Sequence, residues 1–389
     1  MPNARFWRRA LVLAAGALAL AALAPAWGSA EPPQRADYIV VLKGDVGDVS
    51  AVAAEHARRF GGQIKYVYEH ALKGYSISLP PQAIEGLSHN PQVAYVESDA
   101  EVRADTTQSD ATWGIDRIDQ RSLPLSGTFT YTNTGTGVTA YVIDTGILFS
   151  HNEFGGRAIT GYDAVTSGGS AADCNGHGTH VAGTIGGTTY GVAKGATLVA
   201  VRVLGCSGSG STSGVIAGID WVTGSHVAGQ PAVANMSLGG SASTALDDAV
   251  RRSISDGVSY AIAAGNGNAG GIGQNACNSS PARVAEAMTI SAVDRTDKKA
   301  SWANYGSCVD WFAPGVSITS AWWTSSTATN TISGTSMATP HTAGVAALYL
   351  EGNPTASAAT VRDALYAQTA KGIVTSSRTT NNHLLFTSY

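Results

Sequence analysis

The sequence predicts an α/β protein in which a mostly parallel sheet is flanked by helices on both faces, preceded by a small α+β unit. Two observations support this prediction: near-continuous apolar runs rich in β-branched residues, and helical runs that alternate with them. Strands that are apolar throughout are buried on both faces, as in parallel sheets covered by helices. The β-rich runs lie at residues 138–144, 198–204, 232–238, 259–264, 288–293 and 308–312. The helical runs lie at residues 177–185, 213–222, 245–256 and 358–368.

The first thirty residues have the form of a secretory signal peptide. Arg5, Arg8 and Arg9 precede an apolar run at 10–24, and small residues at 28–30 suit a cleavage site. The apolar run is shorter than the roughly 20 residues that cross a bilayer, and no later segment qualifies. We therefore expect residues 1–30 to be removed during export, leaving a secreted protein without a membrane anchor.

Residues 31–105 form the small α+β unit. This segment is acidic, with 11 Asp and Glu against 7 Lys and Arg. Its pattern reads βαββαβ, the split βαβ arrangement, and roughly 75 residues of this kind fold only marginally alone. The expected elements lie at residues 38–42, 46–60, 63–69, 73–79, 82–88 and 93–97.

Three short stretches suggest nucleophilic catalysis. Ser336 precedes a helical run at 342–350, where the unpaired N–H groups of a first helical turn would stabilise an oxyanion. A serine nucleophile needs a base and a carboxylate that orients the base. His177 begins another small-residue helix, and Asp144 closes the apolar run at 138–144. Taken singly, Ser336 could equally be a helix N-cap.

These stretches also carry a family resemblance. The blocks Asp144-Thr145-Gly146, His177-Gly178-Thr179-His180 and Gly334-Thr335-Ser336-Met337-Ala338-Thr339-Pro340 resemble the subtilisin-like serine proteases, and most closely the proteinase K and aqualysin group. The resemblance implies an inhibitory, folding-assisting prosegment at 31–105, which would be cut near Thr106. It also implies a peptidase domain at 106–389 that acts on polypeptide substrates.

The same resemblance implies an oxyanion donor and a substrate cleft. Asn266 follows the apolar run at 259–264 and matches the side-chain donor of the family, although a turn-forming Asn would look the same. The glycines there also match Gly-x-Gly-x-x-Gly, but no helix follows them, so we reject a dinucleotide site. Glycine-rich walls let an extended substrate backbone approach closely. The expected substrate-binding residues are Gly208, Ser209, Gly210, Ser237, Leu238, Gly239, Ala264 and Gly265.

Four cysteines lie in the 106–389 segment. An exported chain favours disulfides, and four cysteines allow three pairings. The resemblance to aqualysin-type enzymes implies the pairs Cys174–Cys206 and Cys277–Cys308. No Cys-x-x-Cys spacing supports zinc.

Calcium is the expected ion, because clustered carboxylate and amide oxygens suit a hard cation. The resemblance assigns one site to Asp116, Asp119, Gln120, Ser126 and Thr128, of which Thr128 is only an approximate match. It assigns a second site to the carbonyls of Ala285 and Ala287 with Asp310. Solvated acidic residues are the alternative at both places.

The sequence thus predicts a secreted, monomeric serine endopeptidase made as a self-processing zymogen. No basic stripe suggests nucleic-acid binding. An α/β-hydrolase esterase is disfavoured, because it needs Gly-x-Ser-x-Gly, and here Ala338 stands at the last position. The alternative within the same fold is a catalytically inactive protein-binding module.

Overall fold

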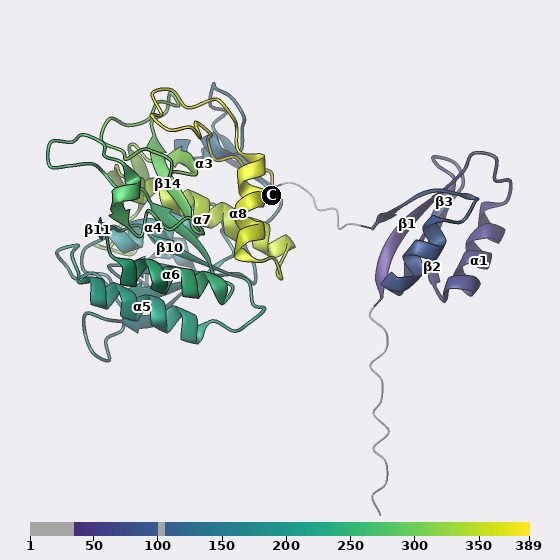
Figure 1. Cartoon of the computed structure of the whole chain (residues 1–389), viewed down its shortest axis with the longest axis horizontal. Helices are drawn as coiled ribbons and strands as arrows, with labels where there is room; N and C mark the ends of the chain where they lie inside the picture. Colours follow the sequence, from purple (N-terminus) through teal and green to yellow (C-terminus); the bar gives the residue numbers. More distant parts are fainter. Residues whose placement is uncertain (1–34, 100–105) are drawn as a thin grey trace, which may run out of the picture. The chain divides into compact units, whose positions relative to one another are not determined.

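A computed structural model describes residues 35–99 and 106–389 of the chain. The expected signal peptide at 1–30 and most of the expected processing junction lie outside the described residues. The chain divides into two compact units, with the division between Val102 and Arg103 (Figure 1). Each unit is described by itself.

The N-terminal unit has the predicted βαββαβ order. Its antiparallel sheet has the strand order β2-β3-β1-β4, and its core includes Val40, Tyr75 and Leu87. The first helix begins three residues later than the predicted 46, because the Asp48 side chain accepts a hydrogen bond from Ala51 N and caps it. The elements are β1 Ala36–Leu42, α1 Val49–Phe60, β2 Gln63–Tyr68, β3 Gly74–Leu79, η1 Pro81–Ala83, α2 Ile84–Ser88 and β4 Val93–Ser98.

The second unit is built on a seven-stranded parallel sheet with the order β15-β14-β12-β10-β7-β9-β8. The strands are β7 Thr139–Asp144, β8 Ala158–Asp163, β9 Thr197–Arg202, β10 Ala232–Met236, β12 Ser259–Ala263, β14 Met288–Val293 and β15 Trp311–Pro314. The helices are α3 Trp113–Ile118, α4 His177–Gly186, α5 Thr212–Ser225, α6 Thr244–Ser255, α7 Thr335–Gly352 and α8 Ala358–Gln368, with short turns η2 Asn152–Phe154 and η3 Ala276–Asn278.

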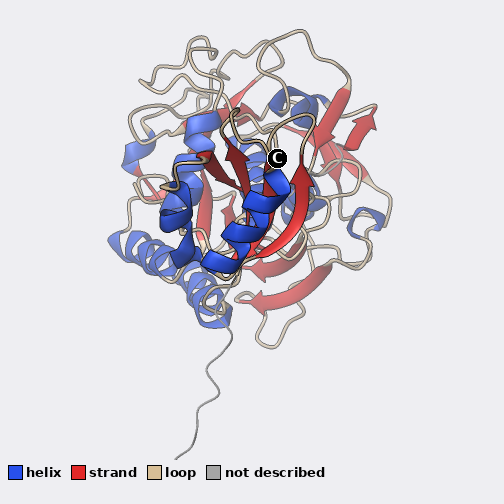
Figure 2. Cartoon of the chain, turned by 90° about the vertical axis from the view of Figure 1, so that its right-hand side faces the viewer, coloured by secondary structure: helices blue, strands red, loops and turns tan. Residues whose placement is uncertain are grey.

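Helices cover both faces of this sheet, as the apolar strands predict (Figure 2). In β7, Ala140 and Val142 point into the core that contains α4, α7 and α8, whereas Tyr141 and Ile143 point into the core that contains α5 and α6. This alternation places one apolar layer on each side of the sheet. The covered sheet is therefore a rigid scaffold, and the ends of its strands can position the side chains of a functional site.

Some elements were missed by the sequence patterns. The edge strand β8 contains Gly161 and the exposed Ile159, so it lacks the apolar run typical of the central strands. The last sheet strand runs from Trp311 to Pro314 rather than over the predicted residues 308–312. Short two-stranded pairs complete the unit: β5 Thr106–Ser109 with β6 Thr128–Tyr131, β11 Gly240–Ser241 with β13 Ser279–Ser280, and β16 Ile318–Ala321 with β17 Thr329–Ile332.

The chain order reverses beside the interior strand β7. Later strands are added on its β10 side, whereas β9 and β8 lie on its other side. Crevices at the carboxyl ends of strands near such a reversal are where open α/β sheets bind their ligands. Within 35–99 and 106–389, no helix is both long and apolar enough to cross a bilayer.

Candidate active site

Asp144 is the last residue of β7 and is fully buried. One carboxylate oxygen, Oδ1, accepts hydrogen bonds from His177 Nδ1 at 2.7 Å and from Thr145 N at 2.7 Å. The strand is held between β9 and β10, so the carboxylate has little freedom to move. Asp144 therefore fixes one nitrogen of the imidazole and leaves the other facing the cleft.

His177 is the first residue of α4, and 25% of its side chain is exposed. The preceding residue, Gly176, has a φ of 109°, and a Cβ there would meet the rings of Trp322 and Trp323 at 2.5 Å. Only glycine suits that position, which explains the Gly-His pair in the sequence. Burial lowers the pKa of His177, but the charge and hydrogen bond of Asp144 raise it to a greater extent, so that the net shift is upward.

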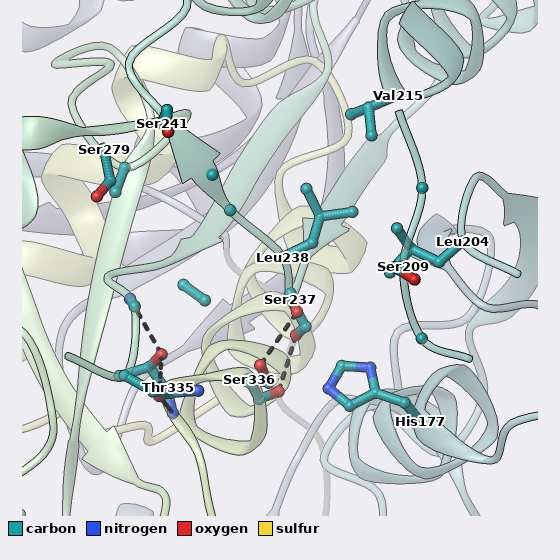
Figure 3. A pocket seen from close by; sticks show the side chains of 18 of the residues that line it. His177, Leu204, Ser209, Val215, Ser237, Leu238, Ser241, Ser279, Thr335 and Ser336 are labelled. Carbon is teal, nitrogen blue, oxygen red and sulfur yellow. Dashed lines mark hydrogen bonds between the residues drawn. The ribbon is translucent and has the colours of Figure 1, made fainter. Parts of the chain in front are cut away.

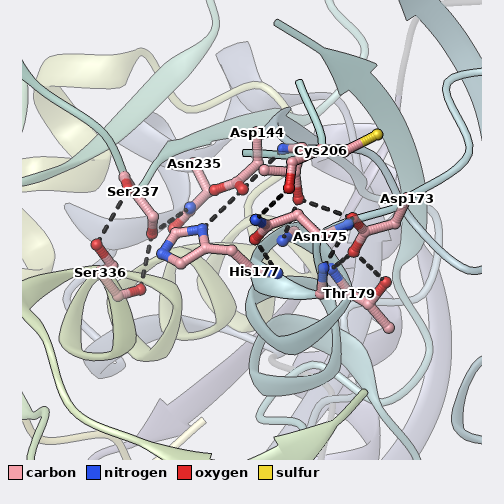
Figure 4. A network of polar contacts seen from close by, with 12 residues as sticks. Asp144, Asp173, Asn175, His177, Thr179, Cys206, Asn235, Ser237 and Ser336 are labelled. Carbon is pink, nitrogen blue, oxygen red and sulfur yellow. Dashed lines mark hydrogen bonds and ion pairs between the residues drawn. The ribbon is translucent and has the colours of Figure 1, made fainter. Parts of the chain in front are cut away.

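Ser336 is the second residue of α7, where first-turn N–H groups have no intrahelical partner. Its Oγ donates a hydrogen bond to the Ser237 carbonyl at 3.0 Å, and Ser237 Oγ donates one back to the Ser336 carbonyl at 2.8 Å. Asn235 Nδ2 donates in turn to Ser237 Oγ. Figures 3 and 4 both show the Ser336 hydroxyl beside the His177 ring. The Ser336 hydroxyl thus donates to Ser237 rather than to His177 in this structure, and catalytic hydrogen bonds commonly tighten only with substrate bound.

Asn266 follows β12 at the same edge of the sheet. Its side-chain Oδ1 accepts hydrogen bonds from both the backbone N and the Oγ1 of Thr335, at 2.8 and 2.9 Å. The amide nitrogen Nδ2 is thereby turned toward the Gly334 backbone, where an ideal Cβ would lie 3.5 Å from it. Sequence reasoning missed Thr335 in this role; its place directly before Ser336 was the available signal.

His177, Ser336 and Asn266 line one cleft with a volume of about 900 Å³, whereas Asp144 lies buried behind it. All eight residues that the resemblance assigned to substrate binding line it, together with His177, Asn266 and Ser336. Sequence reasoning missed the apolar lining residues Leu204, Val215 and Leu246. Leu204 and Val215 lie on the same side of the cleft (Figure 3). His177 is the only ionisable side chain in the described lining.

The structure pairs the cysteines as the resemblance implied. Cys174 is joined to Cys206, and Cys277 to Cys308. The first disulfide connects the loop before His177 to the cleft wall that begins at Ser207. Bridges that close loops of about 30 residues stabilise a fold by roughly 3–4 kcal/mol.

The first expected calcium set comes together around the end of α3. Asp116 accepts hydrogen bonds from Ser126 and Gly127, whereas Asp119 Oδ1 is buried without a partner among the described residues. Burial, together with the smaller effect of the Asp116 charge, raises the pKa of Asp119 to about 6, although the hydrogen bond from the N–H of Thr130 lowers it. Gln120 Oε1 and the hydroxyls of Ser126 and Thr128 lie in the same hydrogen-bonded cluster. A buried, unpartnered carboxylate oxygen beside a second carboxylate fits a hard cation.

The second expected set differs, because a guanidinium already faces it. Arg362 Nη1 donates to the Ala285 carbonyl, and Arg362 Nε lies 4.0 Å from Asp310 Oδ1. Burial raises the pKa of Asp310 to about 6, although Arg362 and the N–H of Thr289 lower it. In the described parts of the chain, no three His, Cys, Asp or Glu side chains are grouped to hold a metal. Calcium at Asp310 and Ala287 would therefore require Arg362 to move.

A carboxylate, an imidazole and a hydroxyl in line at the end of a parallel sheet define a serine hydrolase of the α/β class. The family model of the subtilases matches residues 135–386, and that of the I9 peptidase inhibitors matches residues 37–105. The chain belongs to the subtilase family. It is a serine endopeptidase made as a zymogen, with a prosegment of the I9 inhibitor type that inhibits the enzyme intramolecularly.

Named relatives agree with this assignment. The chain is 61% identical over 330 residues to an extracellular serine proteinase of Thermus sp. (strain Rt41A), covering 85% of this chain and 79% of that protein. It is 53% identical to alkaline serine exoprotease A of Vibrio alginolyticus, covering 83% of this chain and 60% of that one. The crystal structure of a cold adapted subtilisin-like serine proteinase matches with 54% identity and a TM-score of 0.68. The match covers 72% of this chain and 98% of that one.

Proposed function

We propose that Asp144, His177, Ser336 and Asn266 carry out peptide-bond hydrolysis in this chain. The observation that carries the proposal is the 2.7 Å hydrogen bond between His177 Nδ1 and Asp144 Oδ1, with Ser336 beside the free face of the imidazole. His177 Nε2 takes the proton of Ser336 as Oγ attacks the scissile carbonyl, and then gives that proton to the leaving amine. Asp144 holds the imidazole in the required orientation and stabilises its cation.

When Oγ bonds to the carbonyl carbon, the carbonyl oxygen becomes an oxyanion, and it needs hydrogen-bond donors that are already in place. Asn266 Nδ2 and the Ser336 N–H supply them in our proposal. Thr335 keeps the amide of Asn266 in this orientation through its two hydrogen bonds to Oδ1. Acyl-enzyme formation frees the amine product, and a water molecule activated by His177 then releases the acyl group.

The cleft also indicates the substrate class. Gly208–Gly210 and Ser237–Gly239 offer backbone groups on two opposite walls, so an extended peptide binds mainly through its backbone. Because the described lining carries no Asp, Glu, Lys or Arg, we propose a preference for substrates with neutral side chains near the scissile bond. A charged P1 residue would lose its hydration there without gaining a partner.

We further propose that residues 1–30 direct export, that 31–105 form the prosegment and that 106–389 form the mature enzyme. The inhibitor family match ends at residue 105, which supports a cut next to Thr106. The relatives named as extracellular proteinases support secretion. We also propose that the mature enzyme is a monomer that binds neither membranes nor nucleic acids.

Calcium is proposed at Asp116, Asp119, Gln120, Ser126 and Thr128, where it would stabilise the fold and take no part in the chemistry. The unpartnered, buried Asp119 Oδ1 is the observation in its favour.

The test of catalysis is the mass of the secreted Ser336→Ala chain, from a host stripped of extracellular proteases. Self-cleavage needs the Ser336 hydroxyl, whereas folding does not, so the variant should remain joined to residues 31–105. An inactive binding module would be processed, if at all, only by a host protease, so its wild-type and Ser336→Ala chains would have the same state of processing. Normal removal of the prosegment in this variant would count against self-processing, and its hydrolysis of added peptides would count against Ser336 as the nucleophile.

A further inference from the structure

Asp173 is a buried carboxylate behind the catalytic histidine, and only 7% of the residue is exposed. Its Oδ1 accepts hydrogen bonds from Thr145 Oγ1 at 3.0 Å, Asn175 N at 2.9 Å and Gly176 N at 3.0 Å. Its Oδ2 accepts from Thr179 N at 3.0 Å and Thr179 Oγ1 at 2.6 Å. Figure 4 shows Asp173 and Thr179 on the side of His177 that faces away from Ser336.

The five donors lie on residues adjacent to Asp144 and on residues around His177. Thr145 directly follows Asp144 at the end of β7, and its Oγ1 also accepts a hydrogen bond from Gly178 N at 2.8 Å. Gly176 is the N-cap residue of α4, and Thr179 lies in the first turn of this helix, which carries His177. One carboxylate thus connects the strand that bears Asp144 to the helix that bears His177.

The charge of Asp173 is not matched by any of these donors, because all five are neutral N–H or O–H groups. The ionisable groups facing His177 are Asp144 on β7, Asp173, and His180 one turn further along α4. Arg202 on β9 lies near the same loop, but its guanidinium donates to Asp163 and to the sulfurs of the Cys174–Cys206 disulfide. The imidazolium formed during catalysis is therefore the cation that Asp173 can stabilise.

We propose that Asp173 is a positioning residue for the catalytic base: it sets the first turn of α4 against the end of β7 and favours the imidazolium of His177. The proposal rests on the role assigned to His177 above. The upward contribution of Asp173 to the pKa of His177, alongside the larger one from Asp144 and against burial, agrees with it.

The experiment compares the mature wild-type enzyme with Asp173→Asn, using the pH dependence of kcat/KM on a neutral peptide. We expect kcat to fall roughly 10- to 100-fold with KM nearly unchanged, because the imidazole loses its alignment. We also expect the acidic limb of the profile to move to lower pH by roughly half a unit, because a negative charge near His177 is lost.

Two further variants separate charge from structure. Asp163→Asn is the matched control: Asp163 is also buried, at 8%, and accepts hydrogen bonds from Val165 N and Thr166 N. It should lower the melting temperature without moving the acidic limb. Thr179→Val removes one donor to Asp173 but no charge, so it should lower kcat and leave the limb in place.

The outcomes are distinct. An Asp173→Asn enzyme with wild-type kcat and an unmoved acidic limb would overturn the proposal, while leaving the Ser336 mechanism intact. If Asp173→Asn fails to fold, an unchanged kcat in Thr179→Val overturns it instead. Full activity in His177→Ala would show that the proposed function itself has failed.

Discussion

Removal of Arg117 should destabilise the mature enzyme by a large and measurable amount. Arg117 is fully buried in α3 and forms a bidentate salt bridge with Asp297. The Nε–Oδ1 distance is 2.7 Å and the Nη2–Oδ2 distance is 3.0 Å. A third bond runs from Arg117 Nη1 to the Gln120 carbonyl at 2.6 Å. The pair therefore joins α3 and the proposed calcium cluster to the loop after β14, 180 residues away in sequence.

The expected cost follows from the burial of the partner. Arg117→Met fills a similar volume but leaves the Asp297 carboxylate, 6% exposed, without its cation. Breaking one side of a buried pair costs about 3–5 kcal/mol in the free energy of unfolding. A domain of this size has an unfolding entropy of about 0.6 kcal/mol per kelvin, so the melting temperature should fall by about 5–8 °C.

The assay is calorimetry at one scan rate on mature enzyme blocked with a sulfonyl fluoride, which prevents autolysis. Adding Asp297→Asn to Arg117→Met should restore part of the loss, because the orphaned charge is gone. Arg251→Met is the control: Arg251 pairs with Asp248 and Glu286 at the surface, where such pairs contribute at most about 1 kcal/mol. A change of under about 2 °C in Arg117→Met would refute the reasoning.

Three other predictions concern the oxyanion site, calcium and acid. Asn266→Ala should lower kcat on the order of 10²–10³-fold with little change in KM, the range known for such a donor in a subtilisin, and steady-state kinetics would test this. Chelation of calcium should lower the melting temperature of the wild-type enzyme at about pH 7.5. It should have less effect on the wild-type enzyme below pH 6 and on Asp119→Asn at about pH 7.5, because a protonated or neutral side chain at 119 binds calcium poorly and the pKa of Asp119 is raised to about 6. Equal sensitivity to the chelator in all three measurements would contradict calcium binding at that cluster. Burial lowers the pKa of both His180 and His341 to about 4, so the unfolded chain binds more protons below pH 6.5. Stability present above pH 6.5 should be lost as pH falls toward 4, by about 3 kcal/mol per histidine, and His180→Gln should show a shallower loss in acid denaturation monitored by fluorescence.

Residues defined by their local surroundings could be located from the sequence. Asp144 closes an apolar run, and a glycine caps each of the two small-residue helices whose first turns carry His177 and Ser336. Such signals are local because backbone conformation and burial period depend on neighbouring residues. The family blocks extended this to Asn266 and to the glycine walls of the cleft.

Relations between distant segments were decided only by the tertiary structure. Thr335 orients Asn266 from 69 residues away, and Asp173 holds Thr145 from 28 residues away. The apolar lining of the cleft also depends on α5 and α6, which contribute Val215 and Leu246. No local sequence pattern predicts these contacts, because the residues around a polar side chain do not indicate which distant residue will be its hydrogen-bond partner in the fold.

The edge strand β8 shows the same division at the level of the backbone. Its sequence contains Gly161 and lacks a continuous apolar run, as in a loop, and several of its residues are exposed. Its pairing with β9 is what makes it a strand. Strand formation at an edge depends on a neighbour that supplies hydrogen bonds, whereas the central strands are identified by their own apolar composition. The sequence by itself therefore determined the frame and indicated the proposed reacting groups. The tertiary structure determined the partners that orient them, because those partners meet only when the sheet and its covering helices have assembled.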